Sequence, residues 1–299
     1  MDQPLFPIFG RVEILDRTVE IWYNRNRDTA TDITDSIGRS YYGTEESEET
    51  AMNEIRKQDE RGAYLLGSAG IRNLREAHVA VFGIGGVGSY AVEALARAGV
   101  GALTLVDHDT VSESNINRQL IALHSTVGRF KTDVARDRIA DIDPLCTVTV
   151  RHEFFLPENA DSFDFSSFDY VIDAVDTVSA KIELAVRAEA AGTPIISCMG
   201  AGNKLDPTRF TVTDIYKTAG DPLARVMRTR LRKCGVKALK VVCSEEPPSP
   251  HAPEFTDADT EKKGDRRAPG SLSFVPSVAG LVAAGEVIRA LAGISVSHT

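Results

Sequence analysis

The sequence has few cysteines, and none of them form a metal-binding pair. The four residues, Cys146, Cys198, Cys234 and Cys243, are widely scattered, with no C-x-x-C motif. This spacing argues against a four-cysteine zinc site. It is typical of a protein from a reducing cytoplasm, where disulfide bonds are rare.

Long apolar runs and a secretory signal are also missing. No apolar run approaches the roughly 18 residues that a membrane-spanning helix needs. Met1 and Asp2 do not begin the basic-then-apolar pattern of a signal peptide. With 299 residues, 42% hydrophobic and 26% charged, the composition predicts a soluble, cytoplasmic α/β protein without a membrane partner.

The net charge of −9 is unevenly distributed. Residues 1–51 hold 5 of the 34 basic and 11 of the 43 acidic side chains, a net charge of −6. The other 248 residues hold 29 basic and 32 acidic side chains, a net charge of only −3. The overall acidity therefore does not exclude RNA as a partner.

Residues 1–51 differ in character from the rest of the chain. Val12–Ile21 alternates weakly and predicts one edge strand, whereas 24–49 is polar and ends in an acidic run. Because this stretch has too little apolar surface to bury, we expect a disordered extension. We hypothesise that Met52 is the natural start of the protein. Mass spectrometry that detected a peptide retaining Met1 in the native protein would contradict this.

From residue 53 onward, apolar strands alternate with helical patterns. We predict strands at 78–83, 102–107, 146–151, 169–174, 194–198, 209–215 and 241–243. We predict helices at 53–67, 71–76, 88–98, 127–141, 157–163, 178–191, 221–233 and 277–291, with Thr126 capping the fourth and Thr177 or Ser179 the sixth. Strands separated by helices predict a Rossmann-like, doubly wound α/β fold with a mainly parallel sheet over 52–299. The strands and helices after Gly200 form a C-terminal extension of the same domain, and 245–270, rich in proline and charge, is predicted to be a flexible loop.

A glycine-rich turn joins the strand at 78–83 to the helix at 88–98. Gly83, Gly85, Gly86 and Gly88 stand where the backbone can approach an anion at the positive end of a helix. Asp107 follows Gly88 by 19 residues, at the end of the next strand, where an acid holds a ribose hydroxyl. These features alone favour an NAD-dependent oxidoreductase.

A set of polar residues directly behind Asp107 favours a different ligand. It comprises Asp109, Asn115, Arg118 and Lys131. Arginine and lysine neutralise phosphate charge, and carboxylates hold ribose or Mg²⁺. Any one of these side chains is readily explained as a solvated surface group, but the spaced set predicts a triphosphate site.

The same motifs resemble those of the ubiquitin-activating-enzyme-like superfamily that includes the ThiF, MoeB and HesA proteins. They are Gly-x-Gly-Gly-x-Gly, Asp-x-Asp, Ser-Asn-x-Asn-Arg-Gln and Gly-x-x-Lys, together with Asp173-x-x-Asp176. The resemblance implies an ATP site in which the four glycines contact the nucleotide and Asp107 holds the ribose. It implies that the phosphates are bound by Asn115, Arg118 and Lys131. It also implies that Asp109 lies near the adenylation chemistry and that Asp176 is the Mg²⁺ ligand. It leaves Asp173 to order the strand end or to assist the metal, and it implies a homodimer in which Arg61 reaches the partner's phosphates. For Arg61, an ordinary surface position is equally compatible with the sequence.

Within that superfamily, three stretches resemble the tRNA threonylcarbamoyladenosine dehydratases. These are 199–208, 218–224 and 244–247. Molybdopterin and thiamine members usually carry zinc-binding cysteine pairs, which this chain lacks. The resemblance implies ATP-dependent activation and cyclisation of the threonylcarbamoyl carboxylate next to the tRNA anticodon, and a sulfur-relay protein as a further partner. Since such closure needs no enzyme nucleophile, Cys198 and Cys243 are predicted to be buried structural thiols.

A tRNA substrate requires a positive surface. The stretch 223–240 contains seven basic and no acidic side chains. Of these, Arg225, Arg228, Arg232 and Lys233 are the predicted tRNA-binding residues, although a charged run alone usually marks a solvated face. Three alternatives to the dehydratase remain open: an activator of a sulfur-carrier or ubiquitin-like C-terminus, an NAD-dependent oxidoreductase and a non-catalytic scaffold.

Overall fold

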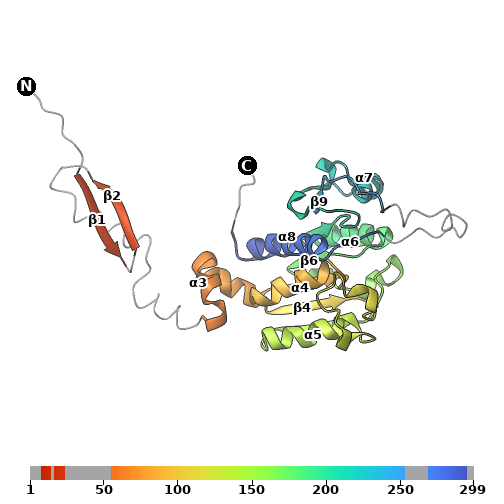
Figure 1. Ribbon diagram of the computed structural model, residues 1–299, viewed down its shortest axis with the longest axis horizontal. Helices are drawn as coiled ribbons and strands as arrows, with labels where there is room; N and C mark the ends of the chain where they lie inside the picture. Colours follow the sequence, from red (N-terminus) through yellow and green to blue (C-terminus); the bar gives the residue numbers. More distant parts are fainter. Residues whose placement is uncertain (1–7, 15–16, 24–54, 253–268, 295–299) are drawn as a thin grey trace, which may run out of the picture. The chain divides into compact units, whose positions relative to one another are not determined.

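The computed structural model describes residues 8–14, 17–23, 55–252 and 269–294. These residues belong to two compact units, Met1–Ile55 and Arg56–Thr299. In the first unit, β1 (Ile8–Ile14) pairs antiparallel with β2 (Arg17–Tyr23) (Figure 1). The single strand predicted over Val12–Ile21 is therefore wrong, because two strands pair here and satisfy each other's backbone groups. The disorder predicted for 24–49 concerns residues outside the described part of the chain.

The second unit contains a seven-stranded sheet with the order β5-β4-β3-β6-β7-β9-β8. Its strands are β3 (His78–Phe82), β4 (Ala102–Val106), β5 (Thr147–Arg151), β6 (Tyr170–Asp173), β7 (Ile195–Cys198), β8 (Phe210–Asp214) and β9 (Lys240–Ser244). Its helices are α3 (Glu60–Glu76), α4 (Gly88–Arg97), α5 (Lys131–Ile142), α6 (Val178–Ala191), α7 (Pro222–Cys234) and α8 (Phe274–Leu291). All neighbouring strands are parallel except β8, which runs antiparallel to β9. The predicted α/β class and mainly parallel sheet are confirmed.

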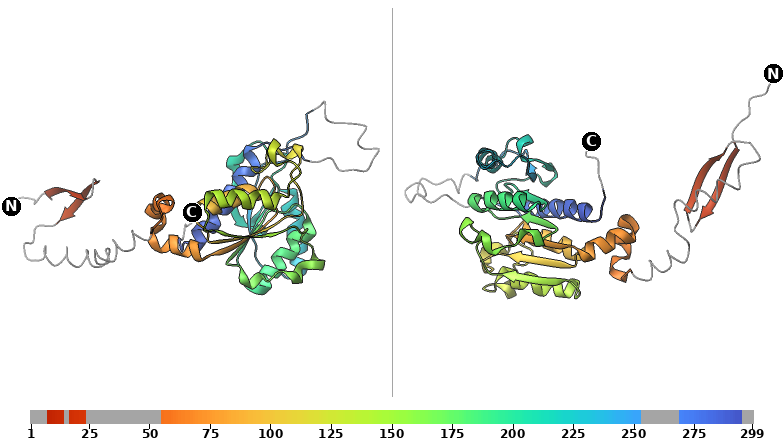
Figure 2. Two further views of the ribbon diagram at one scale, coloured as in Figure 1. Left: turned by 90° about the horizontal axis from the view of Figure 1, so that it is seen from below. Right: turned by 180° about the vertical axis from the view of Figure 1, so that it is seen from behind.

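Helices cover both faces of this sheet (Figure 2). Along β3, Val79 and Val81 pack with residues of α4, α5 and α8, whereas Ala80 and Phe82 pack with α6. Such alternation follows from the period of two in a strand, which sends successive side chains to opposite faces. Burial on both faces explains why the inner strands β3, β4, β6 and β7 are mostly apolar, whereas the edge strands β5 and β8 alternate with polar residues.

The order of the strands creates a switch point between β3 and β6. The chain proceeds from β3 outward through β4 to β5, and then returns to the other side of β3 to form β6 and β7. At such a point, the loops after neighbouring strands diverge to opposite faces and leave a crevice at the carboxyl ends of the strands. The glycine turn after β3 opens onto this crevice.

Four local predictions are wrong. Thr177 stands at the N-cap of α6, but its side chain makes no capping hydrogen bond, because its hydroxyl donates to Asp176 instead. The first predicted helix begins at Glu60 rather than at residue 53, and α3 continues to Glu76 through a break at Gly67, whose φ is 70°. Thr126 does not cap α5, which starts at Lys131, because its hydroxyl instead donates to the carbonyl of Ile121. The predicted helix at 157–163 is a 3₁₀ helix, Pro157–Ser162.

Helix α8 is long and apolar enough to cross a membrane, with 18 residues and a mean hydropathy of 1.5. It is the one described helix of which this is true. The sequence pattern predicted a helix at 277–291 but no apolar run of this length, so on that point the prediction is wrong. Val275, Ala279, Ala283 and Val287 on α8 are buried in the core beneath the sheet and against α4. These contacts account for its apolar composition as that of a core helix.

Candidate functional site

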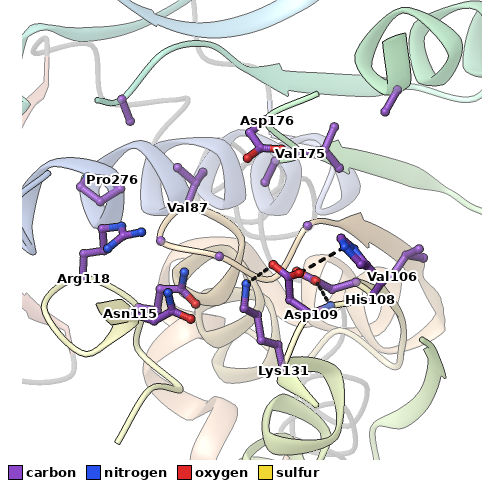
Figure 3. A pocket seen from close by; sticks show the side chains of 18 of the residues that line it. Val87, Val106, His108, Asp109, Asn115, Arg118, Lys131, Val175, Asp176 and Pro276 are labelled. Carbon is purple, nitrogen blue, oxygen red and sulfur yellow. Dashed lines mark hydrogen bonds and ion pairs between the residues drawn. The ribbon is translucent and has the colours of Figure 1, made fainter. Parts of the chain in front are cut away.

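A cavity of about 430 Å³ lies at the switch point, beyond the carboxyl ends of β3, β4 and β6 (Figure 3). Nine of the predicted site residues line it: Gly83, Gly85, Gly86, Asp107, Asp109, Asn115, Arg118, Lys131 and Asp176. Gly88 and Arg61 do not line it. Residues separated by almost a hundred positions in the sequence are thus brought to one place by the topology of the sheet.

The four glycines of the turn serve two different purposes. Gly83 has a φ of +87°, and a Cβ atom there would lie 2.7 Å from the carbonyl oxygen of Ala174. A Cβ atom on Gly88 would lie 1.8 Å from the carbonyl oxygen of Gly83. Gly85, in contrast, has only the Nε2 atom of Gln119 nearby, at 3.8 Å. The first and last glycines are therefore required by packing, and Gly85 leaves open space at the amino-terminal end of α4.

Asp107 ties the end of β4 to the glycine turn. Its Oδ2 atom accepts a hydrogen bond of 2.6 Å from the backbone N–H of Ile84, and its Oδ1 atom accepts one of 2.9 Å from the N–H of Asp109. The carboxylate is thereby fixed at the rim of the cavity. This is the position in which an acidic residue holds a ribose in related folds.

Lys131 places a positive charge on the wall of the cavity. Its side chain is only 6% exposed, and its Nζ atom lies 2.7 Å from Oδ2 of Asp109 (Figure 3). The same carboxylate is 3.2 Å from Nε2 of His108 and is about half exposed. A largely buried ammonium with a single, exposed carboxylate partner is suited to binding an additional anion.

Arg118 and Asn115 come from the loop between β4 and α5. The Nη1 atom of Arg118 donates to the carbonyl of Ser114 and to Oδ1 of Asn117, at 2.9 and 2.8 Å. Asn115 is buried, and its Oδ1 atom accepts a hydrogen bond from the N–H of Ser112. These contacts hold the loop so that both side chains face the cavity.

Two aspartates near the end of β6 have different environments. Asp176 is exposed, lines the cavity and accepts a hydrogen bond of 3.3 Å from the hydroxyl of Thr177. Asp173 is fully buried and forms an ion pair with Lys181 at 3.1 Å. The prediction that Asp173 orders the strand end is confirmed, because its carboxylate is used by protein donors. Of the two, Asp176 is the one whose carboxylate faces the cavity and fits a hydrated Mg²⁺.

The carboxylates beside His108 are less suitable for a metal. One ligand atom each from Asp107, His108 and Asp109 lies within 4.8 Å of the others. However, Asp107 is occupied by two backbone N–H groups, and Asp109 by Lys131. These bonds explain the cluster without an ion.

Several residues that line the cavity were not predicted. They include Gln119, Glu153, Phe154, Ala201, Gly202, Pro269, Ser271 and Pro276. Gln119 belongs to a motif that the sequence does reveal, and its buried Oε1 atom has no hydrogen-bond partner among the described residues. Ala201 and Gly202 belong to the stretch 199–208 that was singled out in the sequence, although no role at the site was predicted for either of them. The remaining residues of this group carry no pattern that would mark them. His108 and Phe154 meet edge to face at the rim, with ring centroids 4.5 Å apart.

Cys198 and Cys243 are buried and do not line the cavity. Burial raises the pKa of each thiol to about 12. Because the thiolate is the nucleophilic form, neither residue is activated. The predicted burial of both thiols is confirmed.

The predicted tRNA-binding residues all lie on α7, which Asp221 caps by accepting a hydrogen bond from the N–H of Ala224. Arg225, Arg232 and Lys233 are exposed. Arg228 is partly buried and donates to the carbonyl of Thr218 at 3.0 Å, so part of its role is structural. Arg61 is exposed on α3.

Comparisons with known proteins show which family the chain resembles. A model of the ThiF family matches residues 59–299. The tRNA threonylcarbamoyladenosine dehydratase of Bacillus subtilis is 46% identical over 239 residues, which cover 78% of this chain and 94% of that protein. The crystal structure of the Escherichia coli tRNA N6-threonylcarbamoyladenosine dehydratase TcdA in complex with ATP has a TM-score of 0.71 and 35% identity, covering 80% of this chain and 95% of that chain. Structures of Escherichia coli MccB, at 15–17% identity and TM-scores of 0.56–0.57, share the fold.

Proposed function

Because the chain belongs to the ThiF family, we propose that it is an ATP-dependent tRNA threonylcarbamoyladenosine dehydratase. It activates the carboxylate of the threonylcarbamoyl group on the adenosine beside the anticodon as an acyl-adenylate. Pyrophosphate is released in this activation step, and AMP is released when the carbamoyl group closes onto the activated carbon. The observation that carries the proposal is the convergence of Arg118, Lys131, Asp107 and Asp176 on one cavity at the switch point of the sheet. The similarity to the Bacillus subtilis dehydratase over most of both chains supports the choice of substrate.

ATP is the first substrate of this reaction. Gly85 and the amino-terminal end of α4 offer backbone N–H groups to the phosphates, and Arg118 and Lys131 supply positive charge. Asp107 would hold the ribose and Asn115 would add a neutral polar group, a proposal supported by the position of both residues in the cavity lining. Mg²⁺ would be held by Asp176 and would neutralise phosphate charge there.

The cyclisation needs positioning rather than an enzyme nucleophile. A carboxylate is a poor electrophile until its oxygen is converted into a good leaving group, which AMP provides. The carbamoyl oxygen belongs to the same side chain as the activated carbon, so closure is intramolecular. Arg118 and Lys131 stabilise the negative charge that is transferred to the departing phosphates. The raised pKa values of Cys198 and Cys243 agree with a reaction that uses no thiol.

The tRNA is proposed to dock on the exposed basic residues of α7, and Arg61 to complete the site of a second copy in a homodimer. The docking site is supported by the charge and exposure of the α7 residues, and the role of Arg61 by the family resemblance together with its exposure on α3. The same proposal includes a cytoplasmic location, where tRNA is modified. It also includes a sulfur-relay protein as an additional partner.

Mass spectrometry of nucleosides tests the function directly. We expect tRNA carrying threonylcarbamoyladenosine to lose the mass of one water when it is incubated with the protein and ATP. The Asp176→Ala variant should abolish this loss. Pyrophosphate exchange that responds to a sulfur-carrier protein instead of this tRNA would contradict the proposal.

A further inference from the structure

The lining of the cavity falls into three parts. Asp107, His108 and Phe154 form one end, and the glycine turn with Arg118 and Lys131 forms a second. The third part is a wall made of Ala201, Gly202, Pro269 and Ser271, which follow β7 and precede α8. We propose that this wall, here named the 201–271 wall, is the binding subsite for the threonylcarbamoyl side chain of the substrate. The proposal rests on the function proposed above.

The chemistry of the 201–271 wall fits a small, uncharged ligand group. The wall has no cationic side chain for a phosphate and no aromatic ring on which a base would stack. It offers small side chains, the hydroxyl of Ser271 and a main chain rich in glycine. A ureido group with a short hydroxyalkyl branch needs such space and such neutral hydrogen-bonding groups.

Asn203 holds the two halves of the wall together. It is the one described non-glycine residue with a positive φ, 56°. Its backbone N–H donates to the carbonyl of Gly270 at 2.8 Å, and its Oδ1 atom accepts from the N–H of Gly270 at 2.6 Å. Its carbonyl accepts from the N–H of Ser249 at 2.7 Å. Asparagine tolerates this conformation better than most residues, so the unusual backbone and the three bonds form one latch.

Close packing adds to the latch. A Cβ atom on Gly202 would lie 2.7 Å from Cβ of Pro269, which shows how closely the two segments approach. One residue beyond Asn203, the buried Lys204 donates to the carbonyl of Glu246 at 2.6 Å. The carboxylate of Glu246 in turn accepts from the N–H groups of Leu205 and Asp206. The wall is therefore fixed before a ligand binds, as a selective subsite requires.

The wall is also connected to the phosphate-binding part of the site. Nδ2 of Asn117 donates to the carbonyl of Ser271 at 3.0 Å, and Oδ1 of the same side chain accepts from Arg118 at 2.8 Å. One amide thus links the backbone of the wall to the guanidinium group. A side chain seated on the wall would lie within the same cavity as the phosphates that its carboxylate must reach.

Filling the subsite tests the proposal. In Ser271→Leu, we expect the KM for threonylcarbamoyl-tRNA to rise at least tenfold, while the Kd for ATP stays within twofold of the wild-type value. Ser273→Leu makes the same change at an exposed position outside the cavity and should leave both constants unchanged. An unchanged KM for the tRNA in Ser271→Leu would overturn the proposal, and so would an equal loss of ATP affinity, because the wall would then belong to the nucleotide site. If the wild-type protein did not dehydrate the tRNA, the proposed function itself would fail.

A second pair of variants tests the latch. Asn203→Ala removes the Oδ1 acceptor and strains the backbone, so it should raise the KM for the tRNA with little change in ATP affinity. Asn203→Asp keeps an acceptor in a residue that tolerates positive φ and should restore the KM to within about threefold of wild type. Equal KM values for Asn203→Ala and the wild type would show that Asn203 does not position the wall.

Discussion

The ammonium group of Lys131 lies 2.7 Å from the Oδ2 atom of Asp109, and only the aspartate of this pair is open to solvent. The lysine is buried beside a cavity whose other walls carry an arginine and a glycine turn. A phosphate that enters the cavity can bind the ammonium group of Lys131 alongside Asp109, without first displacing a shell of water. The pair therefore keeps a positive charge ready in the cavity while the protein is free of ligand.

Removal of this charge should affect the phosphates of the nucleotide and not its base. In Lys131→Met, we expect the Kd for ATP to rise about 10- to 150-fold, since a hydrogen bond to a charged group contributes about 1.5–3 kcal/mol. The Kd for adenosine should be unchanged. Isothermal titration of both ligands measures this, and Lys57→Met, at an exposed position, is the control. A parallel loss of adenosine affinity would show that the variant is misfolded or that Lys131 does not contact phosphate.

The buried pair of Asp173 and Lys181 should dominate the stability of the strand end that carries Asp176. Both side chains are at most 1% exposed, and Lys181 also donates to the carbonyl of Cys198 at 2.7 Å. Lys181→Met leaves a carboxylate buried without its cation and should cost about 3–5 kcal/mol in urea unfolding. Arg187→Met removes solvent-exposed ion pairs with Asp161 and Glu183 and should cost far less. Similar losses in the two variants would contradict the assignment.

Acid should destabilise the protein through Asp143. Burial alone would raise the pKa of this carboxyl group, but hydrogen bonds from Arg56 and from the N–H of Leu145 more than offset that effect, so the pKa is lowered from its ordinary value. A lowered folded-state pKa stabilises the fold above the unfolded-state value of about 3.9, and this stabilisation is lost as the pH falls through the folded-state value. The difference in unfolding free energy between the wild type and Asp143→Asn should therefore shrink from pH 6 to pH 3. A constant difference across this range would refute the linkage.

The buried thiols should be unreactive and dispensable for catalysis. Because the pKa of Cys198 and of Cys243 is raised to about 12, both remain protonated at pH 8. We expect iodoacetamide to modify the exposed Cys234 in the native protein and to spare these two until the chain is unfolded. Cys198→Ala and Cys243→Ala should retain the loss of water from the tRNA. Complete loss of activity in a folded Cys243→Ala protein would point to a thioester step.

Charge reversal on α7 should weaken tRNA binding without affecting ATP. Arg225 and Lys233 are suitable targets because both are exposed, whereas Arg228 also holds Thr218 in place. The double variant Arg225→Glu, Lys233→Glu should lower tRNA affinity at least tenfold and reduce the slope of log K against log salt. Lys57→Glu reverses a charge on another element and serves as the control. An unchanged salt slope would place the tRNA elsewhere.

Sequence patterns predicted the class of the fold and most of the charged groups that line the cavity, since both depend on local features. An apolar strand, a glycine turn and a helix are contiguous in the chain, and Arg118 and Lys131 follow β4 at short range. For Asp173, the sequence left two roles open, and its buried ion pair with Lys181 favours the ordering of the strand end. The 201–271 wall could not be predicted, because Ala201 and Ser271 meet only through the tertiary fold. The helix at α5 was placed too early because Gly128, with a φ of +88°, ends the preceding turn in a way that apolar spacing does not reveal.

Packing at the glycine turn also affects how the motif would change over time. Side chains at Gly83 and Gly88 collide with backbone atoms, so a chain that altered them would be removed for failing to fold. Gly85 meets nothing closer than 3.8 Å and would be free to change once ATP was no longer needed. A descendant that had lost its activity would therefore still present Gly83 and Gly88. Retention of Gly85, rather than of the whole motif, should therefore distinguish an active relative from one that has lost its activity.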